Sequence, residues 1–255
     1  MSERIGRLLA VGNVAEVFEW SSGVVKLYKS TAAKPAAFRE AAIHAAVEAM
    51  GLPVPKVWSV QQIGDRWGVV FDRVKHATFA EQMLSNPKEI PRYLECMVRL
   101  HMRIHAHGAI QFADLKVRLA DNIAATRLLD ERRRRDLLDT IADMPGGDRL
   151  CHGDFHPMNI LGDASQPVII DWPDARRGDP AADVCRSYLL MKFHAAEIAT
   201  TYLDAYCRAA GMSRQAVFSW LPYVAAARLA ENVPGQLDGL LKIVAASLLD
   251  GAHTQ

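Results

Sequence analysis

Residues 150–161 read Leu150-Cys-His-Gly-Asp-Phe-His-Pro-Met-Asn-Ile-Leu161, and residues 168–172 read Val168-Ile-Ile-Asp-Trp172. The first stretch carries Pro157 and several closely spaced polar residues, so it is predicted to form a loop. The second is a short apolar run, and it is predicted to form a strand that carries Asp171. Together they place several side chains capable of chemistry within a short length of chain.

Three residues of the loop, His152, Asp154 and Asn159, fit the spacing H-x-D-x-x-x-x-N, the catalytic-loop pattern of eukaryotic-type kinases. Phosphoryl transfer needs positioning and charge neutralisation more than covalent help from the protein. Asp154 is therefore expected to be the catalytic base beside an acceptor hydroxyl, and His152 to fix the loop by hydrogen bonding. Asn159 and Asp171 offer the oxygen ligands that suit Mg²⁺.

The N-terminal part holds candidates for nucleotide binding. Lys26, in a predicted strand, is expected to hold the α- and β-phosphates, and Glu40 on the following helix to pair with it. Glu48 is the competing partner for Lys26. The turn at Gly12 and Asn13 stands where a phosphate-covering loop is expected, although a plain β-turn explains the same residues.

The first 75 residues are predicted to form a small antiparallel sheet with one helix. The expected strands span residues 7–11, 14–20, 24–28, 57–62 and 67–74, and the expected helix spans residues 35–50. The end of the last strand, with Phe71, Asp72 and Val74, leads into the rest of the chain. Its backbone is expected to hydrogen-bond the adenine ring of a nucleotide.

From Thr78 onward the pattern is mostly helical. Helices are expected at residues 89–107, 115–142, 181–191, 195–210, 214–232 and 236–249. The change of character near residues 74–77 predicts a nucleotide-binding domain at residues 1–75 and a helical catalytic and substrate domain at residues 76–255. This is a two-lobed α+β architecture, with the ligand site expected in the cleft between the lobes.

These motifs resemble the aminoglycoside phosphotransferase and choline kinase family of small-molecule kinases. The resemblance rests on residues 152–161, Ile170-Asp-Trp172, Gly178-Asp-Pro-Ala-Ala-Asp183 and Pro53-Val-Pro55. It implies a bilobal protein-kinase-like fold, ATP or GTP with Mg²⁺, and transfer of the γ-phosphate to a hydroxyl of an aminoglycoside-, choline- or sugar-like molecule.

The same resemblance implies roles for individual residues. Asp154 would be the catalytic base, Asn159 and Asp171 the metal ligands, and Asp179 and Asp183 structural residues that cap a helix and anchor the loop. The sequence departs from the family at Met158, where a glycine is common. Its helical part is also shorter than in many antibiotic-modifying members, which weakens the case for an aminoglycoside acceptor.

Two other functions fit parts of the pattern. On a strand, His152, Asp154 and His156 would share one face, and with Asp171 they could form the metal site of a hydrolase. Pro157 and the kinase-like spacing argue against this alternative. A kinase-fold protein that binds nucleotide without transferring phosphate is the second alternative, but the sequence lacks none of the polar groups that transfer requires.

Two further groups of residues could bind ligands. His101 and His105 lie four residues apart on a predicted helix and could share a metal ion, but no acidic third ligand is apparent in the sequence. Trp172, Tyr188, Trp220 and Tyr223 could form an aromatic cage for a quaternary amine, although helical aromatic residues are more often part of a core. The sequence does not decide which class of molecule accepts the phosphate.

Composition sets the outer limits. Lys plus Arg total 30 and Asp plus Glu total 29, so the net charge of +1 argues against a general nucleic-acid partner. Four scattered cysteines without a CxxC pair indicate reduced thiols. The sequence shows no signal peptide and no apolar run of about 18 residues, so we expect a cytoplasmic protein without a membrane partner. The oligomeric state is not predicted.

Overall fold

The computed structural model describes residues 5–30 and 33–251, with side chains up to residue 246. The described chain divides into two compact units. The sheet unit comprises the described residues up to Ile90 together with Pro157–Pro173, and the helical unit comprises Pro91–His156 and the residues from Asp174 onward. The domain boundary near residue 75 remains a prediction. That prediction does not include residues 157–173 in the N-terminal unit, where the structure groups them.

A five-stranded antiparallel sheet forms the centre of the sheet unit, in the order β1-β2-β3-β5-β4. The strands are β1 (Ile5–Val11), β2 (Ala15–Trp20), β3 (Gly23–Tyr28), β4 (Val57–Ile63) and β5 (Arg66–Asp72). Strand β3 is the middle strand, and Lys26 on it pairs with Val17 on one side and Val69 on the other. Lys26 is therefore held by hydrogen-bonded neighbours on both sides.

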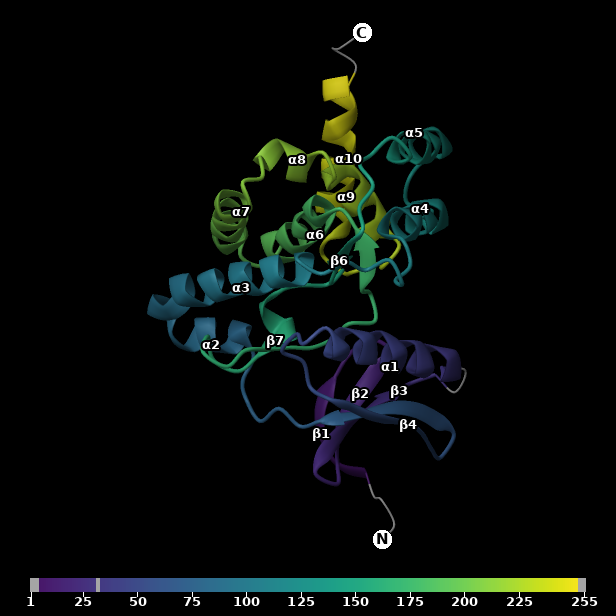
Figure 1. The fold of residues 1–255 in the computed structure, drawn as a ribbon. Coiled ribbons are helices and arrows are strands. Elements are labelled where there is room, and N and C mark those ends of the chain that lie inside the picture. Colours follow the sequence, from purple (N-terminus) through teal and green to yellow (C-terminus); the bar gives the residue numbers. More distant parts are fainter. Residues whose placement is uncertain (1–4, 31–32, 252–255) are drawn as a thin grey trace. The chain divides into compact units, whose positions relative to one another are not determined.

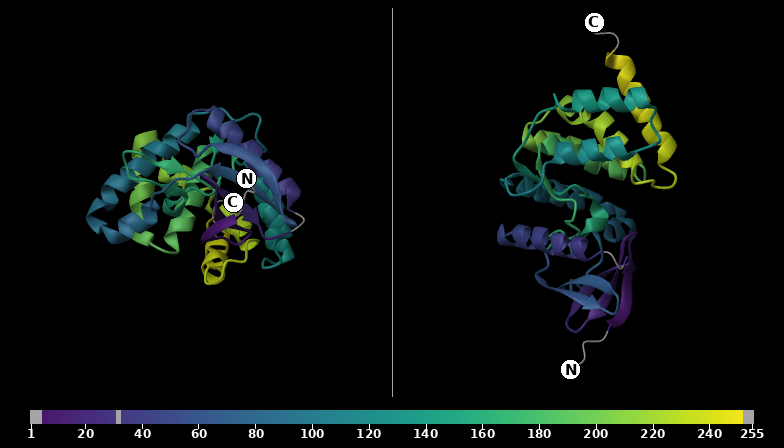
Figure 2. Two further views of the ribbon diagram at one scale, coloured as in Figure 1. Left: turned by 90° about the horizontal axis from the view of Figure 1, so that it is seen from below. Right: turned by 90° about the vertical axis from the view of Figure 1, so that its right-hand side faces the viewer.

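Helix α1 (Lys34–Ala49) packs against β4 and β5, and Figures 1 and 2 show it lying across one face of the sheet. Ala37 on the helix and Val69 and Phe71 on β5 belong to the shared hydrophobic core. A proline in the first turn starts the helix, where its missing N–H costs nothing. Gly51 follows the end of the helix with a φ of 74°, a left-handed conformation that glycine adopts without strain. The predicted strands and helix of this region are confirmed.

The remaining elements of the sheet unit are short: α2 (Phe79–Ser85), η1 (Pro87–Glu89), η2 (Pro157–Asn159), β7 (Ile160–Leu161) and β8 (Val168–Ile169). Helix α2 was not among the expected helices. Its start is a capping box, in which Thr78 accepts from the Glu81 amide and the Glu81 side chain accepts from the Thr78 amide. Strands β7 and β8 form an antiparallel ladder in which Ile160 faces Ile169.

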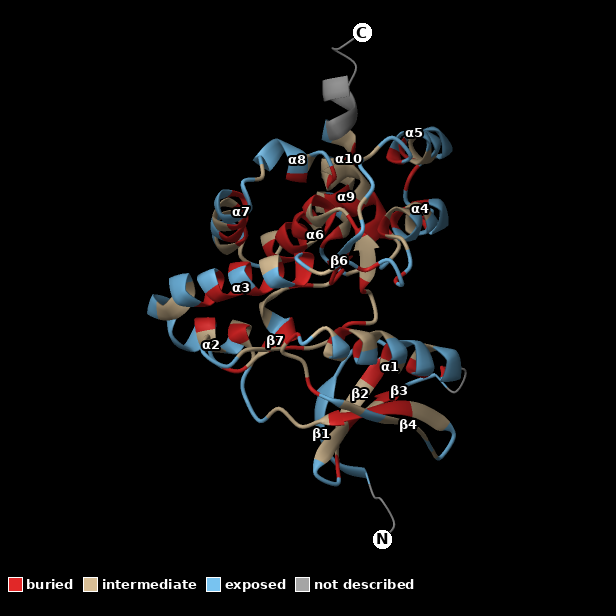
Figure 3. Cartoon of the chain, viewed as in Figure 1, coloured by how far each residue is buried: buried red, intermediate tan, exposed pale blue. Residues whose placement is uncertain are grey.

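The helical unit contains most of the helices. Its elements are α3 (Ile90–His105), α4 (Leu115–Ala125), α5 (Glu131–Ile141), β6 (Arg149–Cys151), β9 (Arg176–Gly178), α6 (Pro180–Lys192), α7 (Ala196–Ala210), α8 (Arg214–Phe218), α9 (Leu221–Leu229) and α10 (Leu237–Gly251). Helix α6 is the central helix, because ten of its 13 residues are buried and it packs against α7 and α9. Figure 3 shows the buried residues of α6 and α9 gathered in the interior of this unit.

Two of the predicted helices are wrong, because each is two helices. The segment predicted at residues 115–142 breaks after Thr126, which has an extended backbone, and restarts at Asp130, whose side chain accepts from the Arg133 amide as an N-cap. The segment predicted at residues 214–232 breaks before Leu221 because Pro222 lies in the first turn of α9 and cannot continue a helix from α8.

The fold class predicted from the sequence is confirmed. The chain is α+β, with a small antiparallel sheet near the N-terminus and a larger, mostly helical remainder. No helix in the described part of the chain is long and apolar enough to cross a membrane. The four cysteines are buried thiols.

Candidate active site

In the sheet unit, Lys26 lies between two carboxylates. Its Nζ atom is 2.8 Å from Glu40 Oε1 and 2.7 Å from Asp171 Oδ1. Glu48, the competing partner, instead accepts a 3.2 Å hydrogen bond from the Val57 amide. Burial lowers the pKa of Lys26, but the charges of Glu40 and Asp171 outweigh it and raise this pKa above its ordinary value. Lys26 is therefore firmly cationic.

A second residue of β3 holds Glu40 from the other side. The Tyr28 hydroxyl donates a hydrogen bond to Glu40 Oε2, and Tyr28 lies two residues after Lys26, on the same face of the strand. Burial and the charge of Glu40 raise the pKa of Tyr28, so the phenol keeps its proton and remains a donor. Both oxygens of Glu40 are thus held by β3. Tyr28 is not among the residues predicted from the sequence, although the two-residue period of a strand places it on the same face as Lys26.

Asn159 and Asp171 flank the ladder of β7 and β8. Asn159 directly precedes β7, Asp171 follows shortly after β8, and the Ile170 amide donates a 3.0 Å hydrogen bond to the Asn159 carbonyl. The antiparallel ladder therefore brings both residues to the same end. Asp171 was predicted to lie in the strand, which is wrong: its φ of 66° is left-handed and ends the strand geometry. This turn directs the Asp171 carboxylate to Lys26.

The donor set in the sheet unit fits a magnesium ion. Lys26 supplies one positive charge against the negative charges of Glu40 and Asp171, so the group as a whole favours an additional cation. The Asp171 side chain is 40% exposed and accessible, and the buried Asn159 adds an amide oxygen at the same end of the ladder. Carboxylate and amide oxygens are the hard ligands that Mg²⁺ prefers.

The predicted phosphate-covering turn is a closed turn in this structure. The Gly12 amide donates a 2.9 Å hydrogen bond to the Ala15 carbonyl, and Lys29 Nζ donates to the Gly12 carbonyl at 2.6 Å. The Gly12 amide is thus used inside the turn. The predicted phosphate contact of this turn would therefore be made by groups other than the Gly12 amide, such as the Asn13 backbone.

The predicted adenine-binding segment lies at the end of β5. Phe71 is buried in the core and pairs with strands on both sides. The Asp72 amide donates to the Lys56 carbonyl at 2.9 Å, and its carboxylate accepts from Trp58 Nε1 at 2.7 Å. Val74 lies beyond the end of the strand, and a contact of this segment with adenine stays a prediction.

In the helical unit, the loop after β6 is fixed by hydrogen bonds to its backbone. Asp183, on α6, accepts from the amides of His152 at 2.6 Å and Gly153 at 2.8 Å. The fully buried His152 ring accepts from the Asp154 amide through Nδ1 at 3.2 Å. Gly153 has a φ of 81°, and a Cβ there would lie 2.4 Å from the Asp174 carbonyl oxygen, so only glycine fits. His152 and Asp183 thus shape the loop.

Asp154 lies between two cationic or potentially cationic side chains. Arg186 Nη2 is 3.4 Å from Asp154 Oδ1, and His156 Nε2 is 3.4 Å from Asp154 Oδ2. Burial raises the pKa of Asp154, but the hydrogen bond with His156 and the charge of Arg186 outweigh it and hold this pKa well below the ordinary value. Asp154 is therefore an anionic acceptor and is 26% exposed.

The arrangement needed for a hydrolase metal site is absent from these residues. Strand β6 ends at Cys151, so His152, Asp154 and His156 do not alternate along a strand, and the premise of that alternative is wrong. The His152 ring faces the Asp154 amide, whereas the His156 ring faces the Asp154 carboxylate. The two histidine rings thus contact different groups of Asp154.

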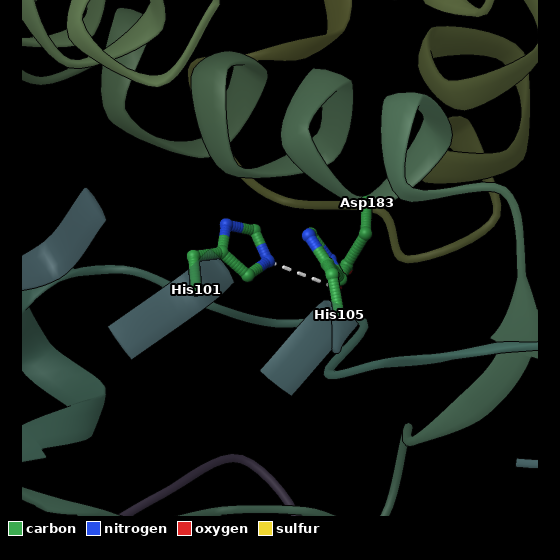
Figure 4. A group of neighbouring side chains, drawn as sticks. All are labelled: His101, His105 and Asp183. Carbon is green, nitrogen blue, oxygen red and sulfur yellow. Dashed lines mark hydrogen bonds and ion pairs between the residues drawn. The ribbon is translucent and has the colours of Figure 1, made fainter. Parts of the chain in front are cut away.

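His101 and His105 on α3 do have an acidic neighbour, which the sequence analysis missed. Figure 4 shows both rings beside Asp183, whose Oδ2 lies 2.9 Å from His101 Nε2 and 3.1 Å from His105 Nε2. The hydroxyls of Tyr202 and Tyr206 bond the two Nδ1 atoms. Burial lowers the pKa of His101 to about 3, so this ring is neutral. Every ring nitrogen has a partner within the protein, so the cluster is explained as a network that holds Asp183, without a metal ion.

The proposed aromatic cage finds no support in the helical unit. Trp220 is 1% exposed and donates from Nε1 to Asp179 at 3.1 Å, while Tyr223 donates to Thr140 Oγ1 at 3.0 Å. Asp179 also caps α6 by accepting from the Ala181 amide, as expected of a structural residue.

Comparison with known structures agrees with this geometry at the level of the fold. An aminoglycoside phosphotransferase APH(4)-Ia, a thermostable mutant in apo form, aligns with a TM-score of 0.69 and 16% identity over 98% of this chain and 96% of that chain. An aminoglycoside-3'-phosphotransferase of type VIII aligns with a TM-score of 0.61 and 19% identity over 90% of this chain and 92% of that chain. The enzyme APH(3'')-Id from Streptomyces rimosus, in complex with ADP and streptomycin, aligns with a TM-score of 0.63 and 16% identity over 83% of this chain and 90% of that chain.

Sequence comparison establishes the family. A search of curated protein sequences found no match. The model of the phosphotransferase enzyme family, however, matches residues 15–221, a span that includes Lys26, Glu40, Asp154, Asn159 and Asp171. With the fold of the aminoglycoside phosphotransferases and a family match over most of its length, this chain belongs to the phosphotransferase enzyme family.

Proposed function

We propose that this phosphotransferase moves the γ-phosphate of ATP to a hydroxyl group of a small molecule, with Mg²⁺ as the cofactor. The observation that carries the proposal is Lys26, half-buried on the middle strand of the sheet and held between Glu40 and Asp171 at 2.8 and 2.7 Å. A half-buried lysine paired with the buried carboxylate of Glu40 is costly to build, and it suits a site that handles phosphate and metal charge.

The sheet unit would bind the nucleotide. Lys26 would hold the α- and β-phosphates, and Glu40, itself held by Tyr28, would keep Lys26 in place. Asp171 and Asn159 would ligate Mg²⁺, which when bound neutralises charge on the phosphate oxygens. Asp171 already accepts a hydrogen bond from Lys26, so nucleotide binding would redistribute the contacts of this cation.

The helical unit would handle the acceptor. Asp154 would accept a hydrogen bond from the acceptor hydroxyl and orient its oxygen toward the γ-phosphorus. As the new P–O bond forms, the bond between the γ-phosphorus and the bridging oxygen breaks, ADP leaves, and the hydroxyl proton passes to Asp154. The pKa of Asp154 is held below its ordinary value, so the carboxylate is anionic and can accept the hydrogen bond of the hydroxyl.

The acceptor class is proposed from the relatives. Structures similar to this chain hold ADP with hygromycin B and ADP with streptomycin, and both of these ligands are small molecules. We extend to this chain the coarser feature, a small hydroxyl-bearing acceptor of aminoglycoside-, choline- or sugar-like chemistry. GTP is the alternative phosphate donor to ATP.

The experiment that tests this function is an ADP-release assay on the purified chain. MgATP is supplied with aminoglycosides, choline, sugars, amino acids and nucleosides in turn, and ³¹P NMR identifies any new phosphomonoester. We expect one class of acceptor to raise ADP formation and to yield its phosphate ester in equal amount. Tight MgATP binding with no acceptor-dependent ADP would instead support a nucleotide-binding protein without transferase activity. The same series with GTP decides the donor.

A further inference from the structure

One side chain of α6, Arg186, contacts the catalytic loop in two places and the segment after α9 in a third. Its Nε donates to the Gly153 carbonyl, Nη2 lies 3.4 Å from Asp154 Oδ1, and Nη1 lies 2.8 Å from Glu231 Oε1. The Arg186 side chain is only 14% exposed. A planar guanidinium with five N–H donors can serve three acceptors in fixed directions, which a lysine cannot do.

Helix α6 thus holds the loop through both its backbone N–H groups and a backbone carbonyl. Asp183 accepts from the loop amides at His152 and Gly153, and Arg186, three residues later and on the same side of the helix, donates to the Gly153 carbonyl. The peptide groups on both sides of Gly153 are therefore fixed by one rigid element. The Arg186 fork also reaches the side chain of the next residue, Asp154.

Glu231 has two arginine partners. It binds Arg186 through Oε1 and Arg228 through Oε2, the latter at 2.6 Å, and Arg228 Nε donates to the buried Gln236 at 2.8 Å. Asn232, with a φ of 49°, turns the chain directly after Glu231. The segment after α9 is thus built to present Glu231 to the far side of Arg186.

Charges alternate along this chain of contacts. Asp154, Arg186, Glu231 and Arg228 follow one another as negative, positive, negative and positive groups. Arg186 has a carboxylate on either side, Asp154 and Glu231, so Asp154 is not its only ionic partner. The position of Arg186 therefore depends on Glu231 as much as on the loop.

We propose that Arg186 is a positioning residue for Asp154 and that Glu231 holds Arg186 in the geometry that this requires. The proposal rests on the proposed function, in which Asp154 orients the acceptor hydroxyl. Arg186 fixes the Gly153 peptide and one carboxylate oxygen of Asp154, and Glu231 fixes the guanidinium. The segment after α9 thereby helps to hold the loop in the geometry that phosphate transfer requires.

A titration that needs no activity tests the first half. The Asp154 carboxyl signal is followed by ¹³C NMR in protein labelled at aspartate and is assigned by its loss in Asp154→Asn. Asp154 is faced by Arg186, His156 and His152, so Arg186→Gln removes only one of the groups that lower the pKa of Asp154. In Arg186→Gln we expect the midpoint of the Asp154 titration to rise by at least about one pH unit, and in Arg186→Lys, which keeps the charge, to rise less. An unchanged midpoint in Arg186→Gln overturns the proposal.

Turnover tests the positioning. MgATP hydrolysis, with water as the acceptor, is measured for the same variants and for Glu231→Gln. We expect kcat to fall roughly 100-fold in both Arg186→Gln and Arg186→Lys, with KM for MgATP unchanged, because a small misplacement of a reacting group costs that much. The double variant Arg186→Gln with Glu231→Gln should be no slower than Arg186→Gln alone, since the two residues act as one unit. Additive losses, or a rise in KM without a loss in kcat, contradict the proposal.

A matched control separates this role from general loss of charge or stability. Arg132, 90% exposed on α5, is replaced in Arg132→Gln and should leave the Asp154 titration, kcat and KM unchanged. If wild-type protein binds MgATP but forms no ADP with water or with any of the acceptors, the proposed function fails, and the titration still decides whether Arg186 controls Asp154. If the Asp154 midpoint rises as expected in Arg186→Gln but kcat is unchanged in an active enzyme, the positioning role of Arg186 is overturned and the proposed function is not.

Discussion

Lys26 donates a 2.7 Å hydrogen bond to Asp171, which lies 145 residues further along the chain. The middle strand of the sheet and the turn after β8 are thus joined through their side chains. Glu40 completes the group at 2.8 Å from the same Nζ atom. One cation between two carboxylates leaves an excess of negative charge, which is the electrostatic setting in which a divalent cation is bound.

Replacing Lys26 should weaken both stability and nucleotide binding. Lys26→Met leaves Glu40, which is 2% exposed, without its cation, and an uncompensated buried charge costs about 3 kcal/mol of unfolding free energy. Denaturant unfolding and calorimetric titration with MgATP measure the two effects. Lys56→Met, at an exposed lysine of the same unit, should change neither. Equal behaviour of the two variants would mean that the ion pair contributes nothing.

Tyr28→Phe should weaken the site without changing its shape. The variant lacks the hydroxyl that donates to Glu40 Oε2, so a buried carboxylate oxygen loses a partner at a cost of about 1–3 kcal/mol. Affinity for MgATP should fall as well, because Glu40 no longer holds Lys26 firmly. Tyr223→Phe is the matched control, since it loses an exposed hydrogen bond to Thr140. The expectation fails if both variants unfold at the same denaturant concentration.

The buried His101 makes stability depend on pH. Burial, with the neighbouring His105, lowers its pKa to about 3, against about 6.5 in an unfolded chain. Its stabilising contribution is therefore complete above about pH 6.5 and declines toward pH 3, because the unfolded state takes up the proton first. Between pH 6 and 4 this term removes about 1.4 kcal/mol per pH unit. In His101→Gln the plot of unfolding free energy against pH should have a correspondingly shallower slope, and an unchanged slope would contradict the expectation.

Asp171→Asn should uncouple nucleotide binding from magnesium. In the wild type we expect Mg²⁺ to tighten ATP binding, and in the variant this effect should shrink by at least about tenfold, or about 1.4 kcal/mol. Thermal shift and calorimetry with ATP, with and without Mg²⁺, provide the comparison. Asp65→Asn, at an exposed turn of the same unit, is the control. An undiminished magnesium effect in Asp171→Asn would show that the ligand is another residue.

Much of the sheet unit could be predicted because its signals are local. Strand alternation, turn residues and a proline-initiated helix lie within a few residues of one another, and they gave the strands and α1. The break between α4 and α5 was missed although Asp130 is a strong N-cap residue, because the helical pattern on both sides was read as continuous. The turn at Asp171 was missed because a left-handed aspartate has no clear signal in a short apolar run.

The partners of the site residues were harder to predict. Glu40 was named as a partner of Lys26 from the kinase-like pattern, but Tyr28, Arg186 and Glu231 were not, because their contacts depend on how separate elements pack. His101 and Asp183 are 82 residues apart in sequence, and only the packing of α3 against α6 brings them to hydrogen-bond distance. Such pairs have no short-range pattern that a single sequence reveals.

The central claim, that Asp154 directs phosphate to an acceptor hydroxyl, is tested most directly by Asp154→Asn. The measurement pairs MgATP affinity by calorimetry with acceptor-dependent formation of ADP and phosphomonoester. We predict wild-type MgATP affinity and a loss of transfer of roughly 10²–10⁴-fold in the variant. Transfer at the wild-type rate in Asp154→Asn would contradict the account.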